Sequence, residues 1–265
     1  MRVALTIAGS DSGGGAGIQA DLRTFAAHLV HGTSAVTAVT AQNSVGVTGW
    51  APIDPGLVAA QIEAVATDMP VGATKTGMLG TAAVVEVVAD AARRLRLGPL
   101  VVDPVMVAKS GDRLIDPAAQ AAYVSRLFPL AALVTPNLHE AAALVGRRVD
   151  DLASMREAAR ALHGLGAAAV LVKGGALPGE TVDVLFDGVT VVEIPGPRVD
   201  TRNVHGTGCT LSAAICARLA LGAPLEEAVR GAKDYLVEGL RRSYNVGKGR
   251  GPVQHLHPLM GAQRV

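Results

Sequence analysis

Short apolar runs alternate with longer amphipathic segments along most of the chain. The first pair is a strand predicted at residues 2–8 and a helix at residues 18–30, where apolar side chains recur at helical spacing. Further strands are predicted at residues 33–41, 73–77, 100–103, 133–135 and 168–173, and further helices at residues 55–67, 81–97, 138–145, 154–164, 207–220 and 225–243. This alternation indicates right-handed crossovers and a mostly parallel sheet covered on both faces.

Capping signals support two of the helix boundaries. Asp54 and Pro55 form a favourable N-cap and first-turn pair, which opens one helix. Residues 154–157 have the Ser-x-x-Glu pattern of a capping box, which predicts that another helix begins there.

A hairpin signal lies late in the chain. Asp187 and Gly188 separate two strand-like runs, residues 182–186 and 189–194, which predicts antiparallel strands at one edge of the sheet. The chain shows no linker, repeat or low-complexity segment. We therefore expect one α/β domain over residues 1–265, with a three-layer, doubly wound and mostly parallel sheet that ends in an antiparallel hairpin.

Composition narrows the class of protein. With 49% hydrophobic and 18% charged residues, the chain is less charged than the average of about 25% and must enclose a large core. A net charge of +1 gives no electrostatic case for binding nucleic acid or an anionic membrane. Residues 24–53 contain no Asp, Glu, Lys or Arg, but the polar residues among them favour a buried strand and a neutral pocket over a membrane span. No targeting segment is evident.

The two cysteines, Cys209 and Cys216, lie on one predicted helix. Their spacing corresponds to a rise of about 10 Å, whereas the Cα atoms of a disulfide lie within about 7 Å of each other. We therefore expect two free thiols, as in a reduced cytoplasmic protein.

Polar residues follow the carboxyl ends of the predicted parallel strands, where ligands bind in sheets of this kind. They are Gly9-Ser10-Asp11, Gln42-Asn43, residues 75–78, Asp103, Asn137 with Glu140, and Lys173-Gly174-Gly175. We expect them to converge on one rim. Lys173 is a strong candidate for a functional role, because the chain has five lysines against nineteen arginines and this one leaves a buried strand into two glycines.

Several of these residues also have purely structural interpretations. Asp103, which precedes Pro104, is equally explained as the end of its strand, and Glu140 as a solvated residue in the first turn of a helix. Gln42 is as well suited to satisfying neighbouring backbone as to binding a ligand. The pattern alone leaves these alternatives open.

The familiar nucleotide-binding motifs are not met. The chain has no Gly-x-x-x-x-Gly-Lys-[Ser/Thr] sequence. Gly15-x-Gly17-x-x-Ala20 fits the loosest dinucleotide fingerprint, but the acidic residue expected about 20 positions further on is missing. The sequence therefore argues against a dehydrogenase.

Residues 203–214, N-V-H-G-T-G-C-T-L-S-A-A, form a glycine-rich turn that leads into a helix. Gly206 and Gly208 allow the backbone to turn sharply, and the N–H groups and positive end of the following helix favour an anion. The same field is expected to lower the pKa of the Cys209 thiol. Cys209 is alternatively a small buried hydrophobe, and His205 is a candidate protease-like base that lacks a third partner in the sequence.

The chain resembles the ribokinase-like superfamily and, within it, the hydroxymethylpyrimidine and phosphomethylpyrimidine kinases of thiamine biosynthesis. The resemblance runs nearly end to end and rests on A-L-T-I-A-G-S-D-S-G-G-G-A-G-I-Q-A-D-L, A-Q-N-S-V-G-V, T-K-T-G-M-L, V-V-D-P-V-M-V-A-K-S-G, T-P-N-L-H-E-A-A-A-L, V-K-G-G, H-G-T-G-C-T-L-S-A-A and G-K-G-R-G-P-V-Q-H. Sugar kinases of the superfamily typically carry aspartate where this chain has Cys209, so cysteine here resembles the pyrimidine-kinase branch.

The resemblance implies a reaction and a set of roles. The γ-phosphoryl group of ATP passes to the hydroxymethyl oxygen of 4-amino-5-hydroxymethyl-2-methylpyrimidine, and a second transfer gives the diphosphate. Cys209 takes the position of the catalytic base, and residues 206–209 supply backbone N–H groups to the transferring phosphoryl. The implied catalytic residues are Gly206, Thr207, Gly208, Cys209 and Lys173; the implied ATP-binding residues are Lys173, Thr207 and Asn137.

Further roles and two alternatives follow from the same resemblance. Asp103 and Glu140, together with Asn137, are expected to position Mg²⁺, mainly through water. The substrate pocket is expected to consist of Gly9, Asp21, Gln42, Met78 and Val105, and a homodimer is implied. The alternatives are a pyridoxal kinase of the same superfamily and a non-catalytic pyrimidine sensor. The intact residues 206–209 and Lys173 argue against a sensor, because binding alone needs no phosphoryl cradle.

Overall fold

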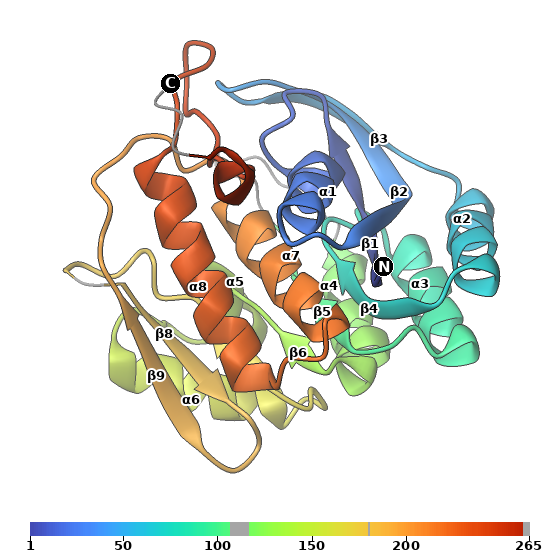
Figure 1. Ribbon diagram of the computed structural model, residues 1–265. Coiled ribbons are helices and arrows are strands. Elements are labelled where there is room, and N and C mark those ends of the chain that lie inside the picture. The colour runs from blue at the N-terminus through green and yellow to red at the C-terminus, as the bar shows by residue number, and fades with distance from the viewer. Residues whose placement is uncertain (107–116, 180, 262–265) are drawn as a thin grey trace.

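Nine strands form one sheet across the part of the chain that the computed structural model describes, residues 1–106, 117–179 and 181–261 (Figure 1). The strands are β1 (Val3–Asp11), β2 (His31–Gln42), β3 (Val47–Pro52), β4 (Val71–Thr76), β5 (Leu100–Val102), β6 (Leu133–Val134), β7 (Val170–Val172), β8 (Thr181–Phe186) and β9 (Val191–Gly196). Their order across the sheet is β3-β2-β1-β4-β5-β6-β7-β8-β9.

The centre of the sheet is parallel and both edges are antiparallel. Strands β2, β1, β4, β5, β6 and β7 pair in parallel. At one edge β8 and β9 form the predicted hairpin, and β8 also runs antiparallel to β7. At the other edge β3 pairs antiparallel with β2. The predicted α/β class and edge hairpin are confirmed, whereas β3 was not predicted.

Helices cover the two faces of the sheet and make the fold three-layered (Figure 1). One face carries α1 (Gly17–Ala27), α7 (Thr207–Ala220) and α8 (Leu225–Arg241). The other carries α2 (Pro55–Asp68), α3 (Ala82–Leu95), α4 (Pro117–Ala122), α5 (Leu138–Val145) and α6 (Leu152–His163). Alternate strand residues divide between the two cores, as the period of two requires: Ala4 and Val101 pack on the α7 side, and Leu5 and Val102 on the α3 side.

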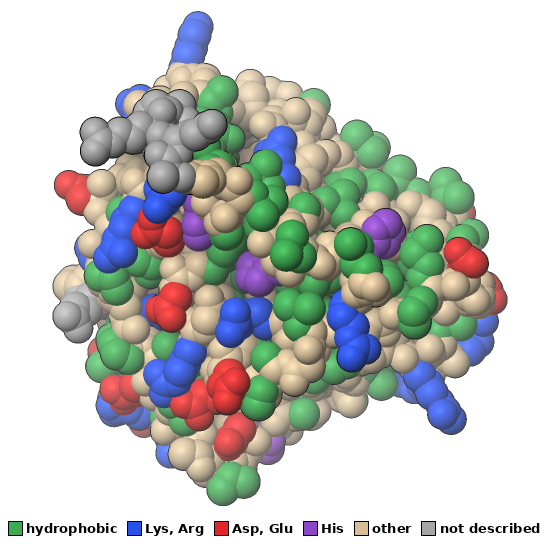
Figure 2. All heavy atoms as spheres, viewed as in Figure 1, with side chains coloured by type: hydrophobic (Ala, Val, Ile, Leu, Met, Phe, Trp, Pro, Cys, Tyr) green, Lys and Arg blue, Asp and Glu red, His purple; other side chains and the backbone are tan. Residues whose placement is uncertain are grey.

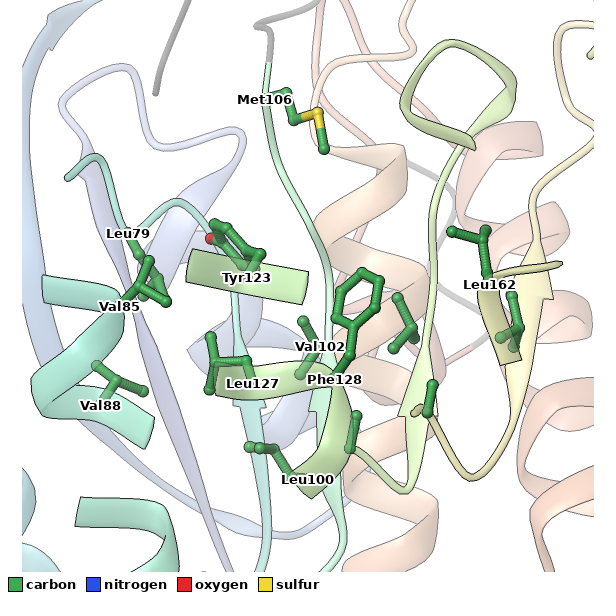
Figure 3. Packing of buried hydrophobic residues seen from close by; sticks show 14 of the residues in the cluster. Leu79, Val85, Val88, Leu100, Val102, Met106, Tyr123, Leu127, Phe128 and Leu162 are labelled. Carbon is green, nitrogen blue, oxygen red and sulfur yellow. The ribbon is translucent and has the colours of Figure 1, made fainter. Parts of the chain in front are cut away.

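The α3 side contains a segment that the apolar pattern did not reveal. After α4 the chain continues through a π-helical turn, Tyr123–Leu127, and a short 3-10 turn, Phe128–Leu130. Tyr123 and Phe128 are fully buried among Leu79, Val85 and Val102 (Figure 3). The Tyr123 hydroxyl donates a hydrogen bond to the Gly77 carbonyl at 2.8 Å, so this core also supports the loop that follows β4.

The two predicted helix starts have different outcomes. Asp54 caps α2 as expected, because its side chain accepts a hydrogen bond from the Leu57 N–H at 3.1 Å. The predicted start at residues 154–157 is wrong. Helix α6 begins one turn earlier, where Asp151 accepts from the Ser154 N–H at 2.7 Å and the Ser154 hydroxyl bonds back to the cap. Both readings fit the sequence pattern, and Asp is at least as good an N-cap as Ser.

The surface carries both signs of charge. On the described part of the face in Figure 2, acidic and basic side chains are interspersed, which agrees with the small net charge. Among the described residues, none of the helices combines the length and the apolar character needed to span a bilayer.

Candidate active site

A pocket of about 790 Å³, including its open mouth, lies where β1, β4 and β5 end and α7 begins. Its lining brings together most of the residues that the sequence analysis selected: Gly9, Gln42, Met78, Asp103, Val105, Asn137, Glu140, Lys173, Gly206, Gly208 and Cys209. The predicted convergence of strand-end residues on one rim is therefore observed. Residues 107–111 of the V-V-D-P-V-M-V-A-K-S-G stretch lie outside the described part of the chain.

Two of the residues to which the resemblance gave a catalytic or binding role do not line the pocket. Asp21 is fully buried on α1, where it pairs with Lys75 Nζ at 2.7 Å and accepts from the Thr6 hydroxyl at 2.6 Å. Lys75, not Asp21, reaches the pocket wall. Thr207 is the half-buried first residue of α7, and its N–H turns back to the Val204 carbonyl at 3.4 Å.

The turn before α7 is built for an anion. Gly206 has a φ of +80°, in the left-handed region that favours glycine. A Cβ at this position would also collide with the Gly15 carbonyl, so two independent constraints require glycine here. The Thr210 N–H bonds to the Gly206 carbonyl at 2.8 Å. Within the described structure the N–H groups of Gly208 and Cys209 have no partner, and they sit at the positive end of α7. Both residues line the pocket, so this end of α7 offers donors to a negatively charged group.

A buried ion pair stands beside this turn. Lys173 Nζ lies 2.8 Å from Asp103 Oδ1, and a Cβ added to Gly208 would lie 3.4 Å from Lys173 Nζ. Asp103 also accepts hydrogen bonds from the hydroxyls of Thr135 and Ser212, each at 3.2 Å. Burial raises the pKa of Asp103, but Lys173 and Lys75 outweigh it and hold that pKa below its ordinary value. Asp103 is thus an ionised group of the site and more than a strand terminator.

Backbone hydrogen bonds fix the loop that carries Lys173. Its N–H donates to the Pro136 carbonyl at 2.8 Å, and the following Gly174 N–H donates to Asp183 Oδ1, also at 2.8 Å. Asp183 in turn pairs with the buried Lys233 of α8 at 2.9 Å. The loop after β7 is therefore fixed to both the hairpin and α8. Asn43, Gly174 and Gly175 follow their strands as predicted but do not line the pocket.

Glu140 is a buried group of the site, not a solvated one. Its carboxylate accepts from the Asn137 N–H at 2.8 Å, and the Asn137 side chain accepts from the Glu140 N–H at 3.0 Å, which forms a capping box at the start of α5. Burial is the main cause that raises the pKa of Glu140 to about 7. Within the described residues no three acidic, histidine or cysteine side chains gather for a metal. Asp103 and Glu140 nevertheless suit Mg²⁺, which takes one or two carboxylates and completes its shell with water and phosphate oxygens.

Another wall of the pocket, away from the charged residues, is apolar and includes the side-chain amide of Gln42. Met78 packs with Ala38, Trp50 and Val105 in a small cluster that borders the cavity. The half-buried Gln42 lies at the end of β2, where its Oε1 is 3.3 Å from the Thr40 hydroxyl. A flat ring with polar edges fits between such a wall and such an amide.

Two further residues of the pocket were not among the site residues that the family resemblance implied. Lys75 lines its floor, and His205 lies at its rim with Nε2 2.8 Å from Asp11 Oδ2. Asp11 is therefore the acidic partner of His205 that a protease-like arrangement needs. The His205 ring nevertheless forms no hydrogen bond to Cys209, so that arrangement is incomplete. The sequence had singled out His205 only as a protease-like base for Cys209, and nothing in it indicated the pairing with Asp11.

Comparisons with known proteins agree with this geometry. The family model described as Phosphomethylpyrimidine kinase matches residues 11–254. Hydroxymethylpyrimidine/phosphomethylpyrimidine kinase of Rhizobium meliloti (strain 1021) is 53% identical over 259 residues, which cover 96% of this chain and 97% of that protein. The chain belongs to the phosphomethylpyrimidine kinase family.

Solved structures confirm the ribokinase-like fold of this family member. Phosphomethylpyrimidine kinase from Clostridium difficile 630 is 40% identical, with a TM-score of 0.80, and the match covers 90% of this chain and 99% of that one. Bacillus subtilis pyridoxal kinase in an ADP complex is also 40% identical, with a TM-score of 0.92 and coverage of 98% and 100%. These relatives are kinases, and this chain is a kinase that uses ATP.

The thiol at the start of α7 does not behave as predicted. Burial raises the pKa of Cys209 to about 11, and the charge of Lys75 offsets this only in part. The expected lowering is therefore wrong, because the hydration that the thiolate loses at this partly buried position outweighs the charge of Lys75 and the helix terminus. Cys209 and Cys216 are both free, as predicted.

Alkylation measures this shift directly. In a Cys216→Ala background, which leaves one thiol, we expect the iodoacetamide rate to rise about tenfold per pH unit from about pH 8 to 10, because the thiolate is the nucleophile. A model thiol, with a pKa of about 8.5, levels off over that range. The matched variant Cys209→Ala retains only the fully buried Cys216 and should not react. A rate that has already levelled off at pH 8 would show that the helix terminus lowers the pKa after all.

Proposed function

We propose that this kinase transfers the γ-phosphoryl group of ATP to the hydroxymethyl oxygen of 4-amino-5-hydroxymethyl-2-methylpyrimidine, and then a second phosphoryl group to the resulting monophosphate. The observation that carries the proposal is the meeting of an anion-binding helix end, Lys173 and Asp103 with a pocket walled by Met78 and Gln42. The names of the relatives support the substrate.

On the nucleotide side, Lys173 and the first turn of α7 hold the phosphates. Lys173 carries a positive charge, because Asp103 and Glu140 raise its pKa although burial lowers it. The N–H groups of Gly208 and Cys209 bind the oxygens of the transferring group, where negative charge is stabilised during transfer. Gly206 sets their direction, Thr207 begins the turn, and Asn137 contributes its amide from the neighbouring loop. Mg²⁺ held by Asp103 and Glu140 would supply further positive charge to the phosphates.

On the acceptor side, Gln42 and the apolar wall select the ring. An amide both donates and accepts hydrogen bonds, so Gln42 matches the edge of an aminopyrimidine. Met78 and Val105 cover the ring, and Gly9 leaves room for it, since a Cβ there would lie 3.3 Å from Met78 Sδ. Asp21 acts from beneath the pocket by fixing Lys75.

Cys209 is proposed as the base for the alcohol acceptor. Its thiol lines the pocket at the start of α7, beside the N–H groups that receive the phosphoryl oxygens. Since the pKa of Cys209 is about 11, only a small fraction of the protein carries the thiolate at neutral pH. The rate of the first transfer should therefore increase with pH.

Three broader features belong to the same proposal. Residues 1–265 form one kinase domain, which the single nine-stranded sheet supports within the described ranges. The family resemblance supports a homodimer, and the two free thiols fit a reduced, cytoplasmic location.

An ATP-consumption assay tests the substrate. We expect ADP release with the hydroxymethylpyrimidine to exceed the release without an acceptor by orders of magnitude, as positioned transfer requires. Pyridoxal is the second candidate acceptor, because a pyridoxal kinase shares the fold at a TM-score of 0.92. Higher kcat/KM with pyridoxal than with the pyrimidine would refute the proposed substrate, and release with neither acceptor would refute the proposed kinase reaction.

Gln42→Leu tests the selection of the ring. The substitution leaves the polar edge of the pyrimidine unpaired, at a cost of about 1–3 kcal/mol. We expect the KM for the pyrimidine to rise about tenfold or more, whereas the KM for ATP stays nearly constant. ATP is the internal control here, and equal losses for both substrates would show that Gln42 supports the fold instead.

Cys209→Ala separates the two transfers. The alcohol must lose a proton, for which a base is worth about 10²–10⁴-fold, whereas a phosphate monoester with a second pKa near 6 is already anionic. We therefore expect kcat/KM for the first acceptor to fall far more than for the second at about pH 7.5, and the rise of the first transfer with pH to disappear. Equal losses would mean that Cys209 shapes the anion site and takes no proton.

A further inference from the structure

The Asp11 carboxylate, at the end of β1, binds the glycine-rich loop that follows it. Asp11 is 3% exposed, and its oxygens accept from the backbone N–H groups of Gly13 at 2.8 Å, Gly15 at 3.0 Å and Ala16 at 2.9 Å. A fourth partner, His205 Nε2, lies 2.8 Å from Oδ2. The loop includes part of the Gly15-x-Gly17-x-x-Ala20 sequence that fits the loosest dinucleotide fingerprint. Its conformation is stabilised by the buried Asp11 carboxylate.

The loop lies directly against the turn that precedes α7. A Cβ on Gly206 would collide with the Gly15 carbonyl, and a Cβ on Gly15 would collide with the His205 ring. The two turns, which lie far apart in the sequence, are therefore in close contact. The position of the first N–H groups of α7 depends on how this contact is held.

His205 stabilises the contact between the two turns through both its side chain and its backbone. Its ring bonds to Asp11, its N–H donates to the Gly251 carbonyl at 3.1 Å, and the next residue is Gly206 itself. Burial raises the pKa of Asp11, but the hydrogen bond and charge of His205 and the backbone N–H groups outweigh it, so Asp11 is ionised. An ionised carboxylate only accepts hydrogen bonds, so the ring proton must be on Nε2. The Gln42 amide nitrogen, 3.5 Å away, therefore packs against Nε2 and does not donate to it.

We infer that His205 is a positioning residue for phosphoryl transfer: through its hydrogen bond to Asp11 it fixes the backbone N–H groups of Gly208 and Cys209 relative to the end of β1. This inference deepens the proposed function and rests on it. His205 takes up no proton from the acceptor and acts only through the turn. A displacement of about 1 Å at such donors is enough to reduce turnover by about two orders of magnitude.

Two amide substitutions test the hydrogen bond. His205→Gln places an N–H donor about where Nε2 lies, and His205→Asn is one methylene too short to reach Asp11. We expect His205→Asn, and likewise His205→Leu, to lower kcat by about ten- to hundredfold for both acceptors, with both KM values changed less than about threefold. His205→Gln should recover kcat to within about threefold of the wild type, because a charge-assisted hydrogen bond is restored.

The comparison of Gln with Asn stays informative if His205→Leu does not fold, since both are polar and of similar size. Equal kcat losses in Gln and Asn, with a matching fall in Tm, would reduce His205 to a structural residue and overturn the inference. A rise confined to the KM for the pyrimidine would show that His205 contacts the substrate as part of the pocket wall, which would also overturn the inference. If the wild type phosphorylates pyridoxal in place of the pyrimidine, the proposed substrate fails, and the same variants assayed with pyridoxal still test His205.

Discussion

Helix α7 begins at the carboxyl ends of the central strands, and the site depends on this placement. Residues 210–217 of the helix are all buried. Small side chains such as Ser212, Ala213 and Ala214 let the helix lie close to the sheet. The Ser212 hydroxyl donates to Asp103, which ties the second turn of the helix to the end of β5. Because the helix cannot shift without disturbing this core, its positive end is held rigidly against the charged side chains of the rim.

Burial gives those charges their properties. Lys75 and Asp21 have no exposed side-chain surface, and their 2.7 Å ion pair lies beneath the pocket. The Asp21 carboxylate raises the pKa of Lys75 although burial lowers it, so a fixed positive charge stands near Cys209. Even so, this charge does not stabilise the thiolate enough to offset its desolvation. The same low dielectric that strengthens the donors of α7 toward a phosphate therefore works against an ionised sulfur.

Much of this architecture followed from the sequence, for physical reasons. Polar residues placed after buried strands had to meet, because parallel strands end at one edge, and the structure brings Gly9, Gln42, Asp103 and Lys173 to one pocket. The hairpin at Asp187 was marked by its turn chemistry.

The missed elements lack such a signal. Strand β3 is short and half-exposed and contains Gly49 and Pro52, so it has little apolar alternation, and it is defined by its pairing with β2. The turns after α4 are likewise defined by tertiary packing around Tyr123. Asp21 was expected in the pocket from the family resemblance, and the sequence does not show that its buried carboxylate pairs with Lys75. The pKa of Cys209 was misjudged because the sequence shows the helix terminus but not the depth of burial.

The pairing of Lys173 with Asp103 explains how the site can be charged and stable before a ligand binds. Their side chains are 12% and 2% exposed, and each offsets part of the cost that the other meets on leaving water. In the proposed function, phosphate would be a new partner for Lys173 and a divalent cation would be a new partner for Asp103. Losing one partner without gaining another costs more at a buried position than in water. The proposed roles would therefore favour the binding of nucleotide and metal together, because the two side chains that would receive them lie 2.8 Å apart.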